Sequence, residues 1–341
     1  MAERTLDLDA EDVRRDIEVR MGEALGAPVT IERWSRLSGG AIQQNLLLDV
    51  ARGDARERYV LRTDARSSVP VSRTRGEEYA LLCAAAASGV RVPAPVCAAS
   101  ATDTRPAWFV MRHVDGVAAG HRLTRPGAVA DAATLVRELG ANLARLHAID
   151  ASTDALGFLG PRPSAPTRVL LASYRAYLDG WRARHGHAWP ALEWGLQWWQ
   201  LRAPADERVV LVHRDYRMGN LMIDDGRLTG TLDWEFAGWG DPLEDIGWFF
   251  APCWRFAGPG KVAGGLAGAA PFLDGYNAVA GTTYTEADTR DWQALAQLRW
   301  AIIALQQCER HEVGGERSLE LTLTGRLLPG LERDLLALTP A

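Results

Sequence analysis

The first third of the chain alternates short apolar runs with turn-forming residues, a pattern typical of a small β-sheet. Five segments are predicted to be strands: residues 29–37, 45–51, 57–63, 92–100 and 106–114. Two helices interrupt the pattern, one over residues 10–25 with Asp9 as its N-cap and one over residues 74–89 that ends at Gly89. We therefore expect a five-stranded antiparallel unit with one inserted helix.

The rest of the chain has the spacing of amphipathic helices. Leu135, Leu139, Leu143 and Leu146 recur at helical spacing, which predicts a long helix over residues 133–149. Further helical segments are expected at residues 168–185, at residues 190–202 and along much of the chain beyond Trp248.

These patterns predict an α+β protein in two parts. Residues 1–113 would form the small β-rich part, and residues 114–341 would form the larger helical part. A cleft between two such parts is a common place for a ligand.

Composition narrows the class of protein. The chain has 341 residues, 47% hydrophobic residues and a formal net charge of −5, which gives no general reason to expect a nucleic-acid or membrane partner. No apolar run reaches the roughly 18 residues that a membrane-spanning helix needs, and the acidic start does not resemble a signal peptide. We expect a cytoplasmic protein.

The cysteines do not have the spacing of a metal site. Cys83, Cys97, Cys253 and Cys308 are far apart in the sequence, whereas structural zinc requires clustered ligands. We interpret them as free thiols in a reducing compartment.

The candidate chemistry begins in the segment "HRDYRMGN" at residues 213–220. A His-Arg-Asp run followed after four residues by Asn is the spacing of a kinase catalytic loop. In that arrangement Asp215 addresses the hydroxyl of an acceptor, and Asn220 turns back toward a metal ion beside the phosphates.

A hairpin follows this loop. In "LMIDDGRLTGTLDW" the Asp225-Gly226 pair predicts a tight turn between two short strands, and the second strand returns the chain to Asp233. Amide and carboxylate oxygens are hard ligands that suit Mg²⁺. Asn220 and Asp233 are therefore predicted to bind Mg²⁺.

These segments resemble the aminoglycoside phosphotransferase and choline kinase-like superfamily, whose members have a protein-kinase-like fold. The chain looks most like bacterial relatives of the kinase domains fused to some acyl-CoA dehydrogenases. The matching motifs run along most of the chain: "LSGGAIQQNLLLDV", "YVLRTD", "GEEYALL", "FVMRHVDG", "HRDYRMGN", "LDWEFAGWGDPLEDIGW" and "YNAVAG". The resemblance implies transfer of the γ-phosphate of ATP or GTP to an alcohol group of a small molecule.

The resemblance also implies a role for individual residues on the catalytic side. Asp215 would be the catalytic acid/base, and Asn220 and Asp233 would bind Mg²⁺. Arg217 would stabilise charge on the transferring phosphate, or would be a structural ion-pair partner. Two further residues would hold the catalytic loop in shape: His213 and Asp241.

On the nucleotide side, Gly39 and Gly40 would let a turn close over the triphosphate. Glu78, with Glu77 as the other candidate, would pair with a cation on the third strand. Backbone groups from Met111 to His113 would meet the adenine ring.

One position departs from the kinase pattern. The lysine of the third strand falls at Arg62, and the only lysine of the chain, Lys261, comes too late in the sequence to replace it. An arginine keeps the charge and can bind phosphate oxygens through two nitrogens, but it is bulkier than lysine. We expect Arg62 to bind the nucleotide phosphates.

The acceptor is suggested by charge. The segment from Pro161 to Arg202 inclusive contains six arginines against two acids, Asp179 and Glu193. This favours an anionic, partly apolar acceptor such as a hydroxyacyl thioester of coenzyme A over a cationic aminoglycoside, unless these arginines form a solvated face. The alternatives are an aminoglycoside 3′-type phosphotransferase and a nucleotide-binding pseudokinase without turnover. His185 and His187 are expected to be surface residues.

Overall fold

The predicted strands form one antiparallel sheet in the order β1-β2-β3-β5-β4. The computed structural model describes residues 6–37, 43–64, 72–256, 258, 260–314 and 318–340. The strands are β1 (Thr30–Arg36), β2 (Gln43–Arg52), β3 (Ala55–Asp64), β4 (Pro95–Ala99) and β5 (Trp108–Arg112). The prediction of five antiparallel strands is confirmed.

The chain forms two compact units by its internal contacts. The sheet unit comprises Met1–Val117, Ile149–Phe158 and Leu221–Ala237, and the helical unit comprises Ala118–Ala148, Leu159–Asn220 and Gly238–Ala341. The boundary between residues 113 and 114 that the sequence suggests for the two parts stays a prediction.

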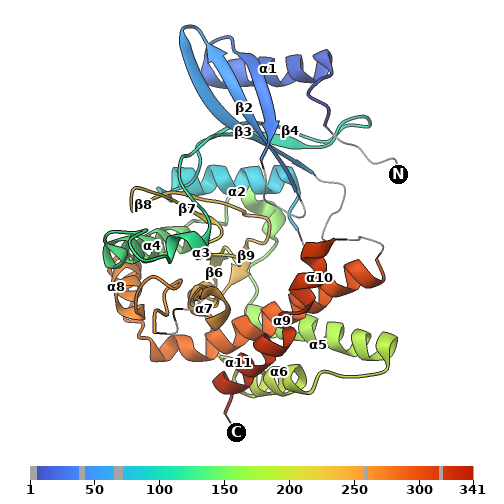
Figure 1. Ribbon diagram of the computed structural model, residues 1–341, viewed down its shortest axis with the longest axis vertical. Coiled ribbons are helices and arrows are strands. Elements are labelled where there is room, and N and C mark those ends of the chain that lie inside the picture. Colours follow the sequence, from blue (N-terminus) through green and yellow to red (C-terminus); the bar gives the residue numbers. More distant parts are fainter. Residues whose placement is uncertain are drawn as a thin grey trace. The chain divides into compact units, whose positions relative to one another are not determined.

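Helix α1 (Glu11–Leu25) packs on the sheet, as the blue end of the chain in Figure 1 shows. Val13, Ile17 and Met21 recur every fourth residue and are buried against the strands. The expected cap is wrong, because the N-cap is Ala10, which has no polar side chain, and the N–H of Asp9 donates to Oδ1 of Asp7 instead.

Helix α2 (Arg75–Ala87) is the inserted helix of the sheet unit. Its first turn has a capping box in which the side chain of Thr74 accepts from the N–H of Glu77 and that of Glu77 accepts from the N–H of Thr74. The cap therefore occupies Glu77, and Glu78 is left on the buried face of the helix.

The predicted hairpin completes the sheet unit. Strands β7 (Leu221–Asp224) and β8 (Arg227–Thr231) pair around Asp225 and Gly226, whose φ angles are 44° and 70°. Two successive left-handed residues are the signature of the tight hairpin turn that Asp-Gly favours.

The helical unit holds the remaining elements. Its helices are α3 (Gly120–Leu123), α4 (Ala132–His147), α5 (Pro166–His185), α6 (Pro190–Arg202), α7 (Pro242–Phe250), α8 (Ala269–Ala280), α9 (Arg290–Glu312), α10 (Leu319–Gly325) and α11 (Leu328–Leu338). Two short antiparallel strands, β6 (Val210–Val212) and β9 (Gly238–Gly240), lie beside each other. No described helix combines the length and the apolar character needed to cross a bilayer.

Two glycines bring α4 and α8 close together. A Cβ atom on Gly140 would lie 2.0 Å from the backbone oxygen of Phe272, and one on Gly275 would lie 2.0 Å from that of Arg137. Any larger side chain at either position would force the two helices apart.

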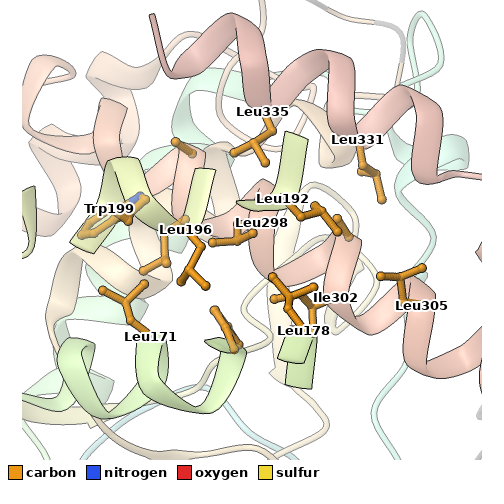
Figure 2. Packing of buried hydrophobic residues seen from close by; sticks show 14 of the residues in the cluster. Leu171, Leu178, Leu192, Leu196, Trp199, Leu298, Ile302, Leu305, Leu331 and Leu335 are labelled. Atoms are coloured by element: carbon orange, nitrogen blue, oxygen red, sulfur yellow. The ribbon is translucent and has the colours of Figure 1, made fainter. Parts of the chain in front are cut away.

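Leucine-rich faces of α5, α6, α9 and α11 form the main core of the helical unit (Figure 2). Leu178, Leu196, Leu298 and Leu335 contribute one buried side chain from each helix. The four cysteines are free thiols, as the sequence predicts, and all are half-buried.

Candidate active site

The loop at residues 213–220 follows β6 and is held by a buried carboxylate of α7. Oδ2 of Asp245 accepts from the N–H of His213 at 2.6 Å, and Oδ1 accepts from the N–H of Arg214 at 2.7 Å. Nε2 of His147 lies 3.1 Å from the same Oδ2. Burial would raise the pKa of Asp245, but His147, His213 and these hydrogen bonds hold that pKa below its ordinary value. Asp245 is therefore a charged anchor for the loop.

Sequence reasoning assigned the anchoring role to Asp241 and did not find Asp245. Asp241 caps α7, since its Oδ1 accepts from the N–H of Leu243 at 2.9 Å, and its Oδ2 accepts from the N–H of Arg208 at 3.2 Å. The available signal was the "DPLEDIGW" run, where Asp245 lies one helical turn after Asp241 and accepts from the loop N–H groups, while Glu244 pairs with the side chain of Arg214 at 3.3 Å. His213 contacts the loop as expected, because its Nδ1 accepts from the N–H of Asp215 at 3.2 Å.

The backbone of the loop is strained where the chemistry is expected. Arg214 has a φ of 66°, a left-handed conformation that is costly for a residue with a Cβ atom. The N–H bond to Asp245 and a hydrogen bond from Nη2 of Arg214 to the backbone oxygen of Trp239 at 2.6 Å compensate for this strain.

Asp215 is buried but for 8% of its surface, and its carboxylate accepts three hydrogen bonds. Oδ1 accepts from Nε of Arg217 and from Nε1 of Trp248, both at 3.0 Å. Oδ2 accepts from Nδ2 of Asn220 at 2.6 Å. A carboxylate in this setting is oriented rigidly, as a base that must address one hydroxyl requires.

Asn220 is fixed by its amide nitrogen. Nδ2 donates both to Oδ2 of Asp215 and to the backbone oxygen of Asp215, at 2.6 and 2.9 Å. The carbonyl oxygen Oδ1 is then the atom of this side chain that can serve as a ligand, and an amide oxygen suits Mg²⁺.

Arg217 lies between two groups of the helical unit. It forms the ion pair with Asp215, and its guanidinium carbon lies 4.8 Å from the ring centroid of Trp254. This position fits the structural ion-pair alternative and leaves the role in charge stabilisation as a prediction.

The sheet unit contains a second cluster around Arg62, of which only 7% is exposed. Nε of Arg62 lies 2.9 Å from Oε1 of Glu78, and Nη2 lies 2.5 Å from Oδ1 of Asp233. Arg75 binds Glu78 from the other side. Burial would lower the pKa of Arg62, but the two carboxylates raise it, so this cation stays charged at any physiological pH.

Asp233 follows β8 and has a φ of 67°. Like Arg214, it is a non-glycine residue with left-handed backbone, and such strain is often found at functional positions. Its carboxylate has the chemistry of a Mg²⁺ ligand, and in this structure it is ion-paired with Arg62.

Glu235 belongs to the same cluster and was not singled out from the sequence. It is 4% exposed, and Oε2 accepts from Oγ of Ser72 at 2.7 Å. Burial and the neighbouring Asp233 raise the pKa of Glu235 to about 7. The "DWE" run was the signal for it, because it places a second acid two residues after Asp233.

The residues predicted to meet adenine lie at the end of β5. Met111 pairs with Val60 of β3. The N–H of Arg112 donates to the backbone oxygen of Ala94 at 2.8 Å, and the N–H of His113 donates to that of Arg58 at 3.0 Å. These two donors are used within the sheet unit, and the adenine role of this segment stays a prediction. Gly39 and Gly40 lie outside the described residues.

Part of the arginine-rich segment is neutralised by acids. Arg175 binds both carboxylate oxygens of Glu193, at 2.5 and 2.7 Å. Arg184 and His185 bind Glu309 of α9 at 2.8 and 3.0 Å. His185 is half-buried and stacks on Trp181 one helical turn earlier. The sequence did not reveal its ion pair, because Glu309 is distant in the chain.

A cavity of about 450 Å³ lies within the helical unit. Its lining includes Arg255, Arg290, Glu286, Val262 and Leu338. Arg255 directly follows Trp254, the residue that stacks on Arg217. The cavity therefore has both charged and aliphatic walls, which suits a ligand that is part polar and part apolar.

Comparisons with known sequences place the chain in a family. The profile of the phosphotransferase enzyme family matches residues 33–298, well over half of the chain. Acyl-CoA dehydrogenase family member 10 of Mus musculus is 26% identical over 220 residues, which cover 59% of this chain and 20% of the mouse protein. Acyl-CoA dehydrogenase family member 11 of Rattus norvegicus is 28% identical over 198 residues, which cover 55% of this chain and 24% of the rat protein. The chain thus matches no more than about a quarter of the length of these relatives.

Solved structures show the same fold at low identity. A protein from Ralstonia eutropha, provisionally described as an aminoglycoside phosphotransferase, has a TM-score of 0.74 and 20% identity, covering 95% of this chain and 97% of its own. The ternary complex of aminoglycoside phosphotransferase APH(4)-Ia with AMP-PNP and hygromycin B has a TM-score of 0.58 and 17% identity, and the match covers 94% of this chain and 98% of the APH(4)-Ia chain.

The gentamicin complex of APH(2")-IIa has a TM-score of 0.61 and 15% identity, covering 97% of each chain. At these identities the likeness shows the fold, which confirms the predicted kinase-like α+β class. With its five-stranded antiparallel sheet, its kinase-type catalytic loop and the family match over residues 33–298, the chain belongs to the phosphotransferase enzyme family.

Proposed function

We propose that this protein transfers the γ-phosphate of ATP to an alcohol group of a small molecule in the presence of Mg²⁺. The observation that carries the proposal is the carboxylate of Asp215, which is buried, oriented by three donors and paired with Asn220 in the loop spacing of kinases. Such a carboxylate can accept the proton of an acceptor hydroxyl as its oxygen attacks the phosphorus atom.

Asn220 and Asp233 would hold Mg²⁺, each through a side-chain oxygen. The ion, when bound, would neutralise charge on the phosphate oxygens. Arg62 would bring a permanent positive charge to the phosphates, since Glu78 and Asp233 fix the direction of its guanidinium. These roles rest on the family's motif spacing together with the chemistry of each side chain.

We further propose that the acceptor is an anionic, partly apolar alcohol such as a hydroxyacyl thioester of coenzyme A. Pairing with acids removes Arg175 and Arg184 from the charge argument made on the sequence. What supports the proposal is the helical-unit cavity, which is lined by Arg255, Arg290 and aliphatic residues, with one acid, Glu286, among the lining residues. The guanidinium of Arg255 is partly used, because it donates to the backbone oxygen of Phe250 and to Oε1 of Gln293. Two guanidiniums beside an apolar wall favour a carboxylate or phosphate group on a carbon chain.

The test is turnover against a panel of acceptors. The purified protein is incubated with Mg²⁺ and ATP and with either hydroxyacyl-CoA thioesters of different chain length or aminoglycosides such as kanamycin, and ADP release and the phosphorylated product are measured. Asp215→Asn is the matched variant, since it keeps the size of the side chain and removes the base. We expect turnover with the thioesters and its loss in Asp215→Asn.

Three other results would contradict the proposal in different ways. Turnover with aminoglycosides alone would replace the acceptor class. ATP binding without turnover on any acceptor would favour the pseudokinase alternative. Turnover that survives in Asp215→Asn would remove Asp215 from the role of base.

A further inference from the structure

Trp248 of α7 points its indole N–H at the predicted catalytic base. Nε1 of Trp248 donates to Oδ1 of Asp215 at 3.0 Å, across 33 residues of sequence. Neither the loop motif nor the metal site accounts for this contact. An indole nitrogen is a donor only and does not change its protonation state, so it can orient a carboxylate without exchanging a proton with it.

The indole ring is held firmly in place. Trp248 is 2% exposed, and the guanidinium carbon of Arg299 lies 4.9 Å from the centroid of its ring. The neighbouring Gly247 lies so close to α9 that a Cβ atom there would lie 2.6 Å from the backbone carbon of Trp292. This contact fixes α7 against α9, and the N–H direction of Trp248 is fixed with it.

Counting acceptor sites shows what the contact does. Each oxygen of an ionised carboxylate can accept two hydrogen bonds. Among the described residues, Oδ1 of Asp215 accepts from both Arg217 and Trp248, whereas Oδ2 accepts from Asn220 alone. Oδ1 is thus saturated, and Oδ2 keeps one site for a further donor.

We propose that Trp248 is a positioning residue for phosphoryl transfer: by saturating Oδ1 together with Arg217, it directs the acceptor hydroxyl to Oδ2 of Asp215. Without the indole N–H, the hydroxyl can approach either oxygen, and only one approach aligns its oxygen with the phosphorus atom. The inference rests on Asp215 being the base, as proposed above.

The test compares Trp248→Phe with the parent in Mg²⁺-dependent ATP hydrolysis, where water serves as the acceptor. We expect kcat to fall about tenfold or more, in line with the loss of a hydrogen bond to a charged group, while the KM for ATP stays unchanged. Trp198→Phe is the matched control, because the indole N–H of Trp198 is buried and has no hydrogen-bond partner in the described part of the chain. The control should keep the parental kcat.

A second comparison separates positioning from packing. In an Asp215→Asn background, Trp248→Phe should lower the residual rate no further, because the indole acts through the carboxylate. A ring that only packs would lower both backgrounds equally. If Trp248→Phe does not fold, 3-benzothienylalanine at position 248 keeps the ring shape and replaces the N–H by sulfur, and the same loss of kcat is expected.

The outcomes distinguish the two proposals. Two results would overturn the role of Trp248 and leave Asp215 as the base. One is Asp215-dependent turnover that Trp248→Phe does not change, and the other is an equal loss of rate from Trp248→Phe in the parent and in Asp215→Asn. Hydrolysis that does not depend on Asp215 would overturn the assignment of the base and this inference with it.

Discussion

Replacing Arg62 by methionine should destabilise the sheet unit far more than the same change at a surface arginine. Methionine keeps much of the side-chain volume and removes the charge. Glu78, with 3% of its side chain exposed, would then keep only Arg75, and Asp233 would lose its contact at 2.5 Å. The change therefore leaves a buried carboxylate with half of its compensation.

The expected magnitude follows from burial. Removing one partner of a buried ion pair costs about 3–5 kcal/mol, because the other charge stays out of water. Because Arg75 remains, Arg62→Met should cost about 3 kcal/mol, the lower end of this range. Arg33 is a matched control on β1, since its Nε lies 2.7 Å from Oδ2 of Asp49 but 79% of its side chain is exposed. Exposed pairs contribute about 0–1 kcal/mol, so Arg33→Met should cost no more than that.

Urea unfolding of the parent and both variants measures this difference, with hydrogen exchange of the β3 amides reporting on the sheet unit specifically. Repeating the measurement in 1 M NaCl should remove the small effect of Arg33→Met by screening and leave that of Arg62→Met. Arg62→Lys should restore part of the stability, because an ammonium cannot contact both carboxylates as the guanidinium does. Equal free energies of unfolding for Arg62→Met and Arg33→Met would refute the reasoning.

Three further predictions concern the helical unit. Burial raises the pKa of Asp241 from 3.8 to about 6, so its favourable contribution to the free energy of unfolding is complete below pH 3.8 and lost as pH rises through about 6. In pH-dependent thermal unfolding, the free energy of unfolding of Asp241→Asn relative to the parent should therefore rise by up to about 3 kcal/mol between pH 4 and pH 8. A difference between the two proteins that does not change with pH would contradict this. Asp245→Asn should lower kcat about tenfold or more while circular dichroism shows a folded protein, because an amide has one oxygen and cannot accept from both loop N–H groups as the carboxylate does. Parental activity would refute the role of Asp245 as anchor. Gly275→Ala should lower the free energy of unfolding by about 1–3 kcal/mol, because its Cβ would lie 2.0 Å from a backbone oxygen. The control is Gly330→Ala in α11, where a Cβ would have nothing within 4 Å and no loss of stability is expected. Equal melting temperatures for the two variants would show that α4 and α8 can separate freely.

Local sequence was sufficient where neighbours in the chain determine the conformation. The five strands, the Asp225-Gly226 turn and the inserted helix could be predicted because alternation, left-handed turn residues and a glycine at a helix end are properties of short segments. The sequence spacing of Asp215 and Asn220 likewise brings the two side chains into contact, because a separation of five residues lets the amide reach back to the carboxylate.

The partners of these residues could not be predicted, because they come from distant segments. Trp248 and Asp245 reach the catalytic loop only because α7 packs against α9 and places one helical face beside β6. The choice of Glu78 over Glu77, left open by the sequence, was decided by the buried face of α2 against Arg62. The sequence by itself thus determined which residues have the chemistry and spacing for phosphoryl transfer. Tertiary packing decided which side chains orient these residues and shift their pKa values, because hydrogen bonds and desolvation act over a few ångströms of space, whatever the separation along the chain.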